Sequence, residues 1–340
     1  MIYLRHFIAI LFFYLSAALY GQWALWGNPS LPGGDSDKGL GANKNEIYLS
    51  LENSTQYIDW WHEPVPGEDF DHAGSLVTTV FRPGAIYGIT NKLNLYLTTA
   101  LGVRSMNWFG DNVSMHHRDE HTAEDFDNAI GGMLGDSKII FRYLLKNTGA
   151  GDGYRIILGS GLTIPSQNTL TINPFAKTDG SVVPHRHFSM SDGTYNYNSD
   201  FQVFYKRSAN PVFFGGSLSI EKPIVENEYS YLPPTSAKTM LSVIYKTFDK
   251  LDSSVDLSLS LQSISHAYWD NEQVSNSDAI IMTPSFGYLF NVKKGAISIG
   301  IQKPYFLSGG FGWNDGEIEE TTKAWQLVLA YRSMAKQIKF

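Results

Sequence analysis

The sequence predicts an all-β fold: a transmembrane, antiparallel, up-and-down β-barrel of about 12 strands, with short periplasmic turns and long outer loops. Three observations predict it. Apolar and polar residues alternate with a period of two, short and long connections alternate along the chain, and the first residues have the layout of an export signal. A period of two indicates strands because successive side chains of a strand point to opposite faces of the sheet.

Composition excludes several classes of protein. The 340 residues are 43% hydrophobic and 14% aromatic, yet the mean hydropathy is −0.17, which is too polar for a bundle of membrane helices. The absence of cysteine excludes disulfides, iron–sulfur clusters and a cysteine nucleophile. A formal charge of −7 argues against a nucleic-acid partner, which would favour a basic surface.

The N-terminal residues predict export. Arg5 and His6 precede an apolar run from Phe7 to Leu15 and then small residues, so residues 1–21 are expected to be a signal peptide that is cut before Gln22. The alternative is an uncleaved anchor, but the run is shorter than the roughly 20 residues that a spanning helix needs. Residues 22–45 are expected to be either a periplasmic tail or a plug segment inside the barrel, and residues 46–340 the barrel itself.

The pattern is clearest where every second residue is apolar and its neighbours are polar, as in Val255–Gln262 and Leu93–Thr98. Applied to the whole chain, it predicts strands near residues 46–60, 75–90, 92–107, 137–147, 153–165, 200–208, 211–223, 238–248, 254–265, 278–291, 294–306 and 323–333. The long connections are 61–74, 109–136, 166–199, 224–237, 266–277 and 307–322. Between one long connection and the next, two strands are joined by a short turn. An even number of strands closes the sheet without exposed edges and puts both ends of the barrel sequence on the periplasmic side.

Charged residues on the polar face of the strands favour a membrane barrel over a soluble one. They would be costly in the dry core of a soluble barrel, whereas a water-filled lumen accommodates them. The excess of bases favours anionic solutes; the alternative is that the bases pair with acids of loops or a plug. The candidates for lumen-lining residues are Arg82, Arg104, Lys138, Arg142, Arg155, Lys206, Lys246, Glu221 and Asp256.

Histidines in two of the long loops are candidate metal ligands. Imidazole binds Zn, Cu or Ni, and a divalent metal is the only cofactor that the sequence suggests. Neither spacing is a specific ligand motif, so the alternative is that these side chains are simply solvated. The candidates are His116, His117, His121, His185 and His187.

Aromatic residues near the strand ends predict belts at the two membrane interfaces, where amphipathic rings are favoured. The loop-side set could also capture apolar solutes. It comprises Trp60, Trp61, Trp108, Tyr195, Tyr197, Trp269, Tyr305, Phe306 and Trp313.

An enzyme in the barrel wall is the third class of function. Outer-membrane phospholipase A is also a 12-stranded barrel and uses a serine with an adjacent histidine base. The nearest candidates here are Ser265-His266 and His187-Phe188-Ser189. Neither has the His-x-Ser-Asn-Gly pattern of that enzyme, so we expect no catalysis.

The C-terminal residues Ile338-Lys339-Phe340 resemble the aromatic end of outer-membrane barrels that the barrel-insertion machinery recognises. Ile338 and Phe340 have the opposite parity to Trp325 and Tyr331. This predicts either a bulge near Met334-Ala335 or a segment that trails beyond the barrel.

A series of motifs resembles the family of outer-membrane channels named for the MetA pathway of phenol degradation. The series covers most of the chain in order and includes the hairpin Pro83–Leu95, Gly135-Asp136 at a strand start, Ile157–Pro165, the Asp192-Gly193-Thr194 loop after Pro184–His187, and Thr283–Tyr288. The resemblance implies an outer-membrane transporter and no catalysis.

We therefore expect a channel or transporter of the bacterial outer membrane for small aromatic or hydrophobic solutes. The alternative is a structural or metal-binding barrel with an occluded lumen. The expected partners are outer-membrane lipids, the insertion machinery through Phe340, and a small-molecule solute.

Overall fold

The computed structural model describes residues 41–64, 69–110, 129–130, 132–148, 151–173, 189–247, 253–274, 277–292, 295–309 and 320–337. The proposed signal peptide, the insertion signal at Phe340 and the loop histidines 116, 117, 121, 185 and 187 lie outside these ranges.

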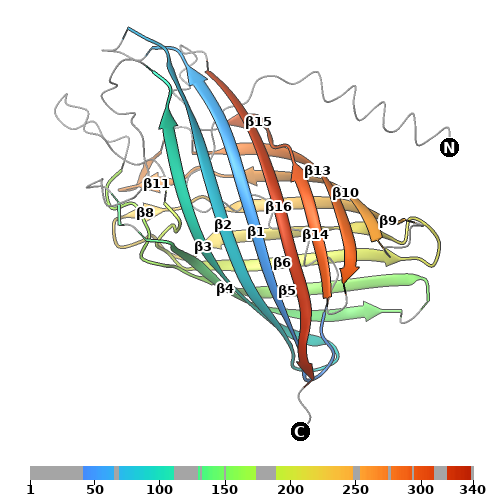
Figure 1. Ribbon diagram of the computed structural model, residues 1–340. Helices are drawn as coiled ribbons and strands as arrows, with labels where there is room; N and C mark the ends of the chain where they lie inside the picture. The colour runs from blue at the N-terminus through green and yellow to red at the C-terminus, as the bar shows by residue number, and fades with distance from the viewer. Residues whose placement is uncertain are drawn as a thin grey trace.

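Twelve strands form a closed antiparallel barrel (Figure 1). Each strand pairs with its neighbour along the chain, and the first closes the ring against the last. The barrel strands are β1 (Glu46–His62), β2 (His72–Gly88), β3 (Leu93–Trp108), β4 (Leu134–Asn147), β5 (Gly153–Ile164), β6 (Asn196–Lys206), β7 (Phe213–Pro223), β9 (Ser236–Lys246), β10 (Ser253–Ile264), β13 (Ala279–Val292), β14 (Gly295–Gln302) and β16 (Glu320–Gln337). The predicted fold class and the alternation of short and long connections are confirmed.

The structure adds detail that the alternation did not predict. The strand expected at 294–306 is broken at Lys303-Pro304 into β14 and β15 (Tyr305–Gly309), because proline has no N–H to donate to a ladder. Two connections expected to be irregular carry a three-stranded sheet of β8 (Tyr231–Leu232), β11 (Tyr268–Trp269) and β12 (Glu272–Gln273). We call it the small sheet.

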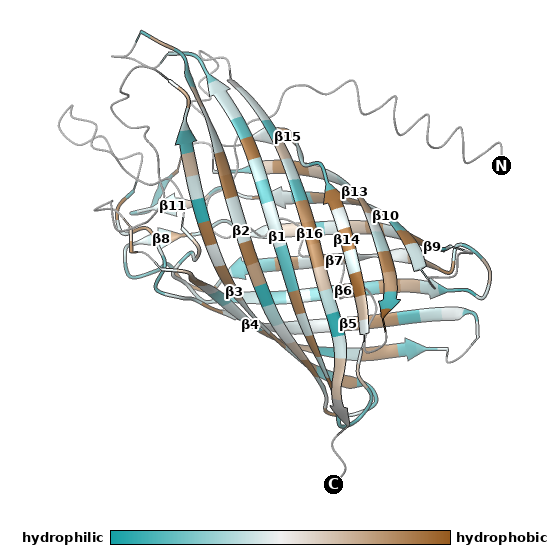
Figure 2. Cartoon of the chain, in the orientation of Figure 1, coloured by the Kyte–Doolittle hydropathy of each residue, from teal (hydrophilic) through white to brown (hydrophobic). Residues whose placement is uncertain are grey.

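The outer surface of the barrel is apolar. Leu49 and Leu51 of β1, and Leu327 and Leu329 of β16, are each 40% or more exposed, and brown and pale residues alternate along these strands in Figure 2. A monomer in water rarely exposes so much contiguous apolar surface, whereas lipid stabilises it. Among the described residues, no helix is long and apolar enough to cross a membrane.

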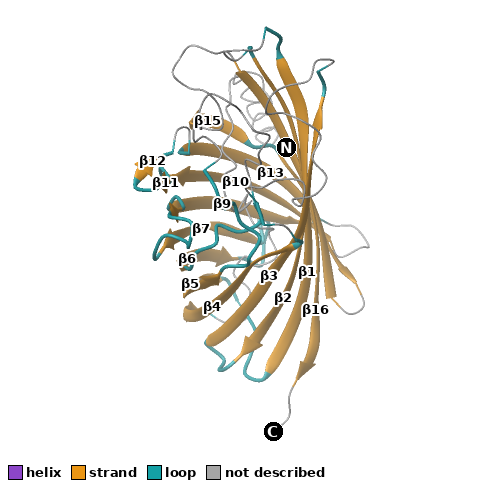
Figure 3. Cartoon of the chain, turned by 90° about the vertical axis from the view of Figure 1, so that its left-hand side faces the viewer, coloured by secondary structure: helices purple, strands orange, loops and turns teal. Residues whose placement is uncertain are grey.

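The strands differ in length around the ring (Figures 1 and 3). Strands β1, β2 and β16 have 17, 17 and 18 residues, whereas β6, β7 and β9 have 11 each. We call the wall of β1–β3 and β16 the long-strand side and the wall of β4–β9 the short-strand side. The end with the long connections is called the loop end, and the opposite end the turn end.

A bulge changes the side-chain parity near the end of the last strand. In the β1–β16 ladder Ile47 pairs with Lys336 and Tyr48 with Met334, so Ala335 has no partner of its own. This is the first of the two explanations that the sequence allowed for the parity change.

Candidate functional site: the barrel interior

The barrel interior is lined mainly by buried polar side chains. Along β1, Glu52, Ser54 and Gln56 are 6%, 5% and 3% exposed, whereas their neighbours Leu51 and Tyr57 are 48% and 42% exposed. Buried residues of this parity point into the barrel, because the alternate residues form the lipid-facing surface. The polar face is therefore inside, opposite to the arrangement of a soluble barrel.

Two predicted lumen residues meet on β4 and β7 near the loop end. The Lys138 ammonium group lies 2.6 Å from Oε2 of Glu221. The hydroxyl of Thr163 donates a 2.7 Å hydrogen bond to Oε1 of the same carboxylate. This ion pair links strands on the short-strand side that are not neighbours in the sheet.

Two predicted arginines pair with acids that the sequence analysis did not select. Arg142 on β4 lies 3.1 Å from Oδ1 of Asp200 on β6, and its guanidinium group stacks over the ring of Tyr96. Arg82 on β2 lies 3.4 Å from Glu52 on β1. Both acids have inward-facing parity, and this parity is the signal in the sequence that could have found them.

The other predicted lumen residues have different surroundings. Arg104 is buried and donates a 3.0 Å hydrogen bond to Thr78, and Asp256 is buried and accepts a 2.7 Å bond from Ser242. Arg155 and Lys206 are half-buried, and Lys246 is exposed at the turn end. A role for the bases in selecting anionic solutes stays a prediction.

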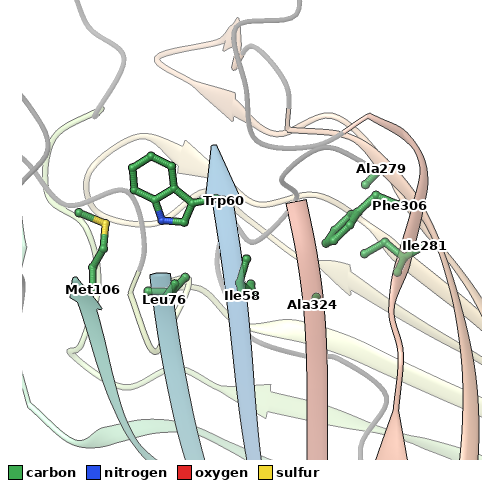
Figure 4. Packing of buried hydrophobic residues seen from close by; sticks show 8 residues of the cluster. All are labelled: Ile58, Trp60, Leu76, Met106, Ala279, Ile281, Phe306 and Ala324. Carbon is green, nitrogen blue, oxygen red and sulfur yellow. The ribbon is translucent and has the colours of Figure 1, made fainter. Parts of the chain in front are cut away.

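An apolar patch lies inside the barrel at the loop end, mainly on the long-strand side (Figure 4). Its buried side chains come from β1, β2, β3, β13, β15 and β16, strands that the ring closure brings together. The apolar patch comprises Ile58, Trp60, Leu76, Met106, Ala279, Ile281, Phe306 and Ala324. Trp60 and Phe306 are 2% and 4% exposed, so their assignment to an interface belt is wrong.

Among the described strands, the pairing of the barrel wall is incomplete beside the apolar patch. β14 pairs with β16 only as far as Gln302 opposite Gln326, and β15 then pairs with β13 alone. The first residues of β16, 320–325, pair with β1 on one edge, and none of the described strands pairs with their other edge. The Lys303 ammonium group, at the break, lies 4.5 Å from the ring centre of Trp325.

Aromatic and imidazole rings continue from the patch toward the loop end. Trp60 stacks on His62 with centroids 5.9 Å apart, and His62 lies 4.6 Å from His72. The indole of Trp108 meets His72 edge-on at 5.3 Å. These rings form one continuous group on β1, β2 and β3.

Loop segments occupy the loop end on the short-strand side. Residues 189–195 pack against β3 and β4: a Cβ added at Gly102 would lie 2.2 Å from Cε of Met190, and one at Gly135 would lie 2.9 Å from its carbonyl oxygen. The small sheet joins them with an apolar core of its own, formed by Leu170, Tyr231, Ala267, Trp269 and Val274. We call residues 189–195 the inward segment.

Residues just before β1 lie inside the turn end. The backbone of Ala42 exchanges two hydrogen bonds with the side chain of Asn94 on β3, of 2.8 and 2.9 Å. Ala42 packs on Ile86 and Tyr96. A Cβ at Gly88 would lie 1.9 Å from the carbonyl oxygen of Asn43, so glycine is what lets this segment contact β2.

The metal site stays a prediction, because its candidate histidines lie outside the described residues. Among these residues no three His, Cys, Asp or Glu side chains converge on one point. His266 Nδ1 lies 3.3 Å from Asp278, but the Ser265 hydroxyl donates to the His266 carbonyl oxygen rather than to its ring. A serine without a base on its hydroxyl is a weak nucleophile.

No known protein-family model matches the chain, and no curated protein sequence matches it. The barrel resembles the COG4313 outer membrane channel from Pseudomonas putida F1, with a TM-score of 0.53 and 12% identity over 89% of this chain and 100% of that one. This likeness shows a shared fold. A Pseudomonas aeruginosa FadL homologue superposes more loosely, with a TM-score of 0.41 and 10% identity over 93% of this chain and 99% of that one. With its lipid-facing surface, the closed barrel is a protein of the bacterial outer membrane.

Proposed function

We propose that the barrel is a passive channel for small aromatic or hydrophobic molecules and carries out no covalent chemistry. The observation that carries the proposal is the apolar patch inside a lumen that is otherwise polar. The resemblance of the sequence motifs to the MetA-pathway channels supports the same function.

The apolar patch suits a solute that leaves water on its way through the wall or lumen. Its residues are between 1% and 5% exposed and pack on one another, so an apolar solute would bind at the edge of the patch and bury the apolar surface that remains there. The ring of Trp108, which is half-buried and lies 6.1 Å from that of the buried Trp60, offers a face at this edge on which a flat aromatic molecule can stack.

Uptake into intact cells tests this function. A deletion strain is complemented with the wild-type gene or with Leu76→Gln or Ile281→Gln, and entry of a radiolabelled aromatic hydrocarbon is measured. Because removing one well-buried aliphatic contact costs about 1.5 kcal/mol, we expect uptake to fall about tenfold. The matched control is Val328→Gln, a buried inward-facing residue of β16 outside the patch. Equal uptake by the deletion strain and the complemented strain would refute the channel.

A barrel with an occluded lumen is the second candidate, because segments fill both ends: the inward segment at the loop end and residues 41–45 at the turn end. Planar-bilayer recordings separate the two. A plug in residues 22–45 predicts that their deletion, or Gly88→Val, raises single-channel conductance. If both variants form heat-modifiable barrels that conduct no current, the result supports the occluded structure instead.

A further inference from the structure

Two acidic residues from motifs that the channel function does not explain come together at the loop end. Asp136 belongs to the Gly135-Asp136 pair at the start of β4, and Asp192 to Asp192-Gly193-Thr194 in the inward segment. The two residues are 5% and 7% exposed, and the charge of Asp136 acts on Asp192. The hydroxyl of Ser191 is within hydrogen-bonding reach of the Asp136 carboxylate.

Hydrogen bonds fix the position of Asp192. The backbone N–H groups of Met190 and Ser191 donate to Asn168, at 3.1 and 2.9 Å. The side-chain amide of Asn227 donates a 3.0 Å bond to the Asp192 carbonyl oxygen. Gly193 has a φ of 72°, a conformation that glycine adopts without strain. The acid is therefore held in place by the surrounding backbone.

The charges around this point do not balance. Asp136, Asp192 and Glu221 interact with one cationic group among the described residues, that of Lys138, which lies 2.6 Å from Glu221. The ammonium group of Lys138 is paired with Glu221, so the carboxylates of Asp136 and Asp192 have no cation of their own among these groups. Burying an uncompensated carboxylate is costly, so it must be neutralised by a proton or by a cation.

Three buried side-chain oxygen atoms in this region have no partner. Oδ2 of Asp136, Oδ1 of Asp192 and Oδ1 of Asn196 are each buried without a hydrogen-bond partner. The amide nitrogen of Asn196 lies 3.4 Å from Glu221, which ties this residue to the same cluster. Native proteins leave few such buried atoms, and each indicates a missing partner.

We propose that Asp136 and Asp192 bind a calcium ion that clips the inward segment to β4. All the candidate donors are oxygen atoms, the ligands of hard cations. Calcium accepts irregular sets of carboxylate, amide and carbonyl oxygens, whereas magnesium demands an octahedral site and keeps several waters, which a buried site cannot hold. With two carboxylates rather than three, neutral oxygens complete the ligand set.

The full-length protein in detergent micelles tests the site directly. Terbium, a luminescent calcium analogue, is titrated into calcium-free protein with excitation of the aromatic rings. Tyr231 interacts with Asp192, and its ring lies 4.9 Å from that of Trp269 in a tilted arrangement. We expect saturable emission that calcium displaces, and a loss of affinity of at least about tenfold in Asp136→Asn and in Asp192→Asn. The matched control is Asp270→Asn, an exposed acid of the β11–β12 turn, which should bind like the wild type.

Calcium binding by the wild-type protein gives a second test, which does not depend on the folding of a variant. The melting temperature of the wild-type protein should rise on adding calcium to EDTA-treated samples, because a ligand of the folded state stabilises it. Equilibrium dialysis should retain one calcium ion per chain. No retained calcium together with an unchanged melting temperature would overturn the proposal, as would full terbium binding by a folded Asp192→Asn variant.

Discussion

At the loop end the two sides of the lumen are filled in different ways. On the long-strand side, side chains of the wall itself, such as Leu76 and Met106, pack into the apolar patch. On the short-strand side, the inward segment and the small sheet cover a wall that carries ion pairs, among them Lys138–Glu221. Both walls have the same alternation, and yet at the loop end the long-strand side carries the apolar patch, whereas the short-strand side carries the Lys138–Glu221 ion pair.

The difference teaches that strand length and lumen chemistry are coupled. Long strands extend beyond their neighbours and need apolar contacts between walls at their ends, whereas short strands leave room that loops fill with backbone polar groups. Those groups need hydrogen-bond partners in a buried place, and the Asn168 and Asn227 side chains supply them. A solute would therefore meet an apolar surface on one side and a polar one on the other.

The largest effect should come from breaking a buried ion pair on the short-strand side. The Arg142 and Asp200 side chains are only 12% and 9% exposed, so Asp200→Asn leaves Arg142 without this carboxylate in a poorly solvated place. We expect the free energy of unfolding to fall by about 3 kcal/mol, measured by urea unfolding in lipid vesicles. The double variant Arg142→Gln with Asp200→Asn should be less destabilised than the single one; equal losses would mean that the two charges are not coupled.

A smaller effect is expected on the long-strand side. Leu76 is 2% exposed within the apolar patch, so Leu76→Ala removes buried contacts and leaves a cavity, at a cost of about 2 kcal/mol. The same unfolding measurement detects it. Leu76→Met, which nearly conserves volume, is the control and should cost less than half as much. If both variants unfold like the wild type, the patch contributes nothing to stability and serves only as a solute surface.

Much of this architecture follows from the sequence. The period of two and the connection lengths predict the closed barrel, because the lipid-facing and lumen-facing residues must alternate. The same parity points Glu52 and Asp200 inward, where they meet Arg82 and Arg142. A parity change near the end of the last strand left two explanations, a bulge near Met334-Ala335 or a trailing segment, and the β1–β16 register shows the bulge.

The sequence pattern could not place residues whose surroundings depend on ring closure. Trp60 has the spacing of an interface tryptophan, but its parity matches that of Gln56 and Ile58, and only the closed ring brings Phe306 into the same patch. The inward segment is equally hidden, because a polar loop rich in Ser, Asp and Gly reads the same whether it faces water or folds back into the lumen. Its buried contacts with Gly102 come from tertiary structure.

A third effect is the pH dependence of stability, which we expect from the short-strand side alone. Burial, and then the charges of Asp136 and Glu221, raise the pKa of Asp192 well above its usual value, while Lys138 lowers it. The folded state then holds this proton more tightly than the unfolded chain does. Without calcium, the contribution of Asp192 to stability is therefore greatest below about pH 4, the pKa of an unfolded aspartate, and falls as the pH rises toward the folded pKa, by at most about 1.4 kcal/mol per pH unit.

Urea unfolding in EDTA at pH 5, 6 and 7 measures this slope. Asp192→Asn should flatten it, whereas Leu76→Ala on the opposite side should leave it unchanged. If the free energy of unfolding changes with pH equally in the wild type and in Asp192→Asn, then Asp192 titrates alike in the folded and unfolded states.

The smallest effect should come from an ion pair outside the lumen. His266 and Asp278 lie 3.3 Å apart, but their side chains are 43% and 44% exposed, so water screens their attraction and competes for both groups. We expect Asp278→Asn to change the free energy of unfolding by less than about 0.5 kcal/mol, in the same assay as Asp200→Asn. The two substitutions are chemically identical and remove one carboxylate each, so their difference isolates the effect of burial. A cost for Asp278→Asn as large as that for Asp200→Asn would mean that the lumen is as well solvated as the outer surface, and the contrast between the two sides would then concern shape alone.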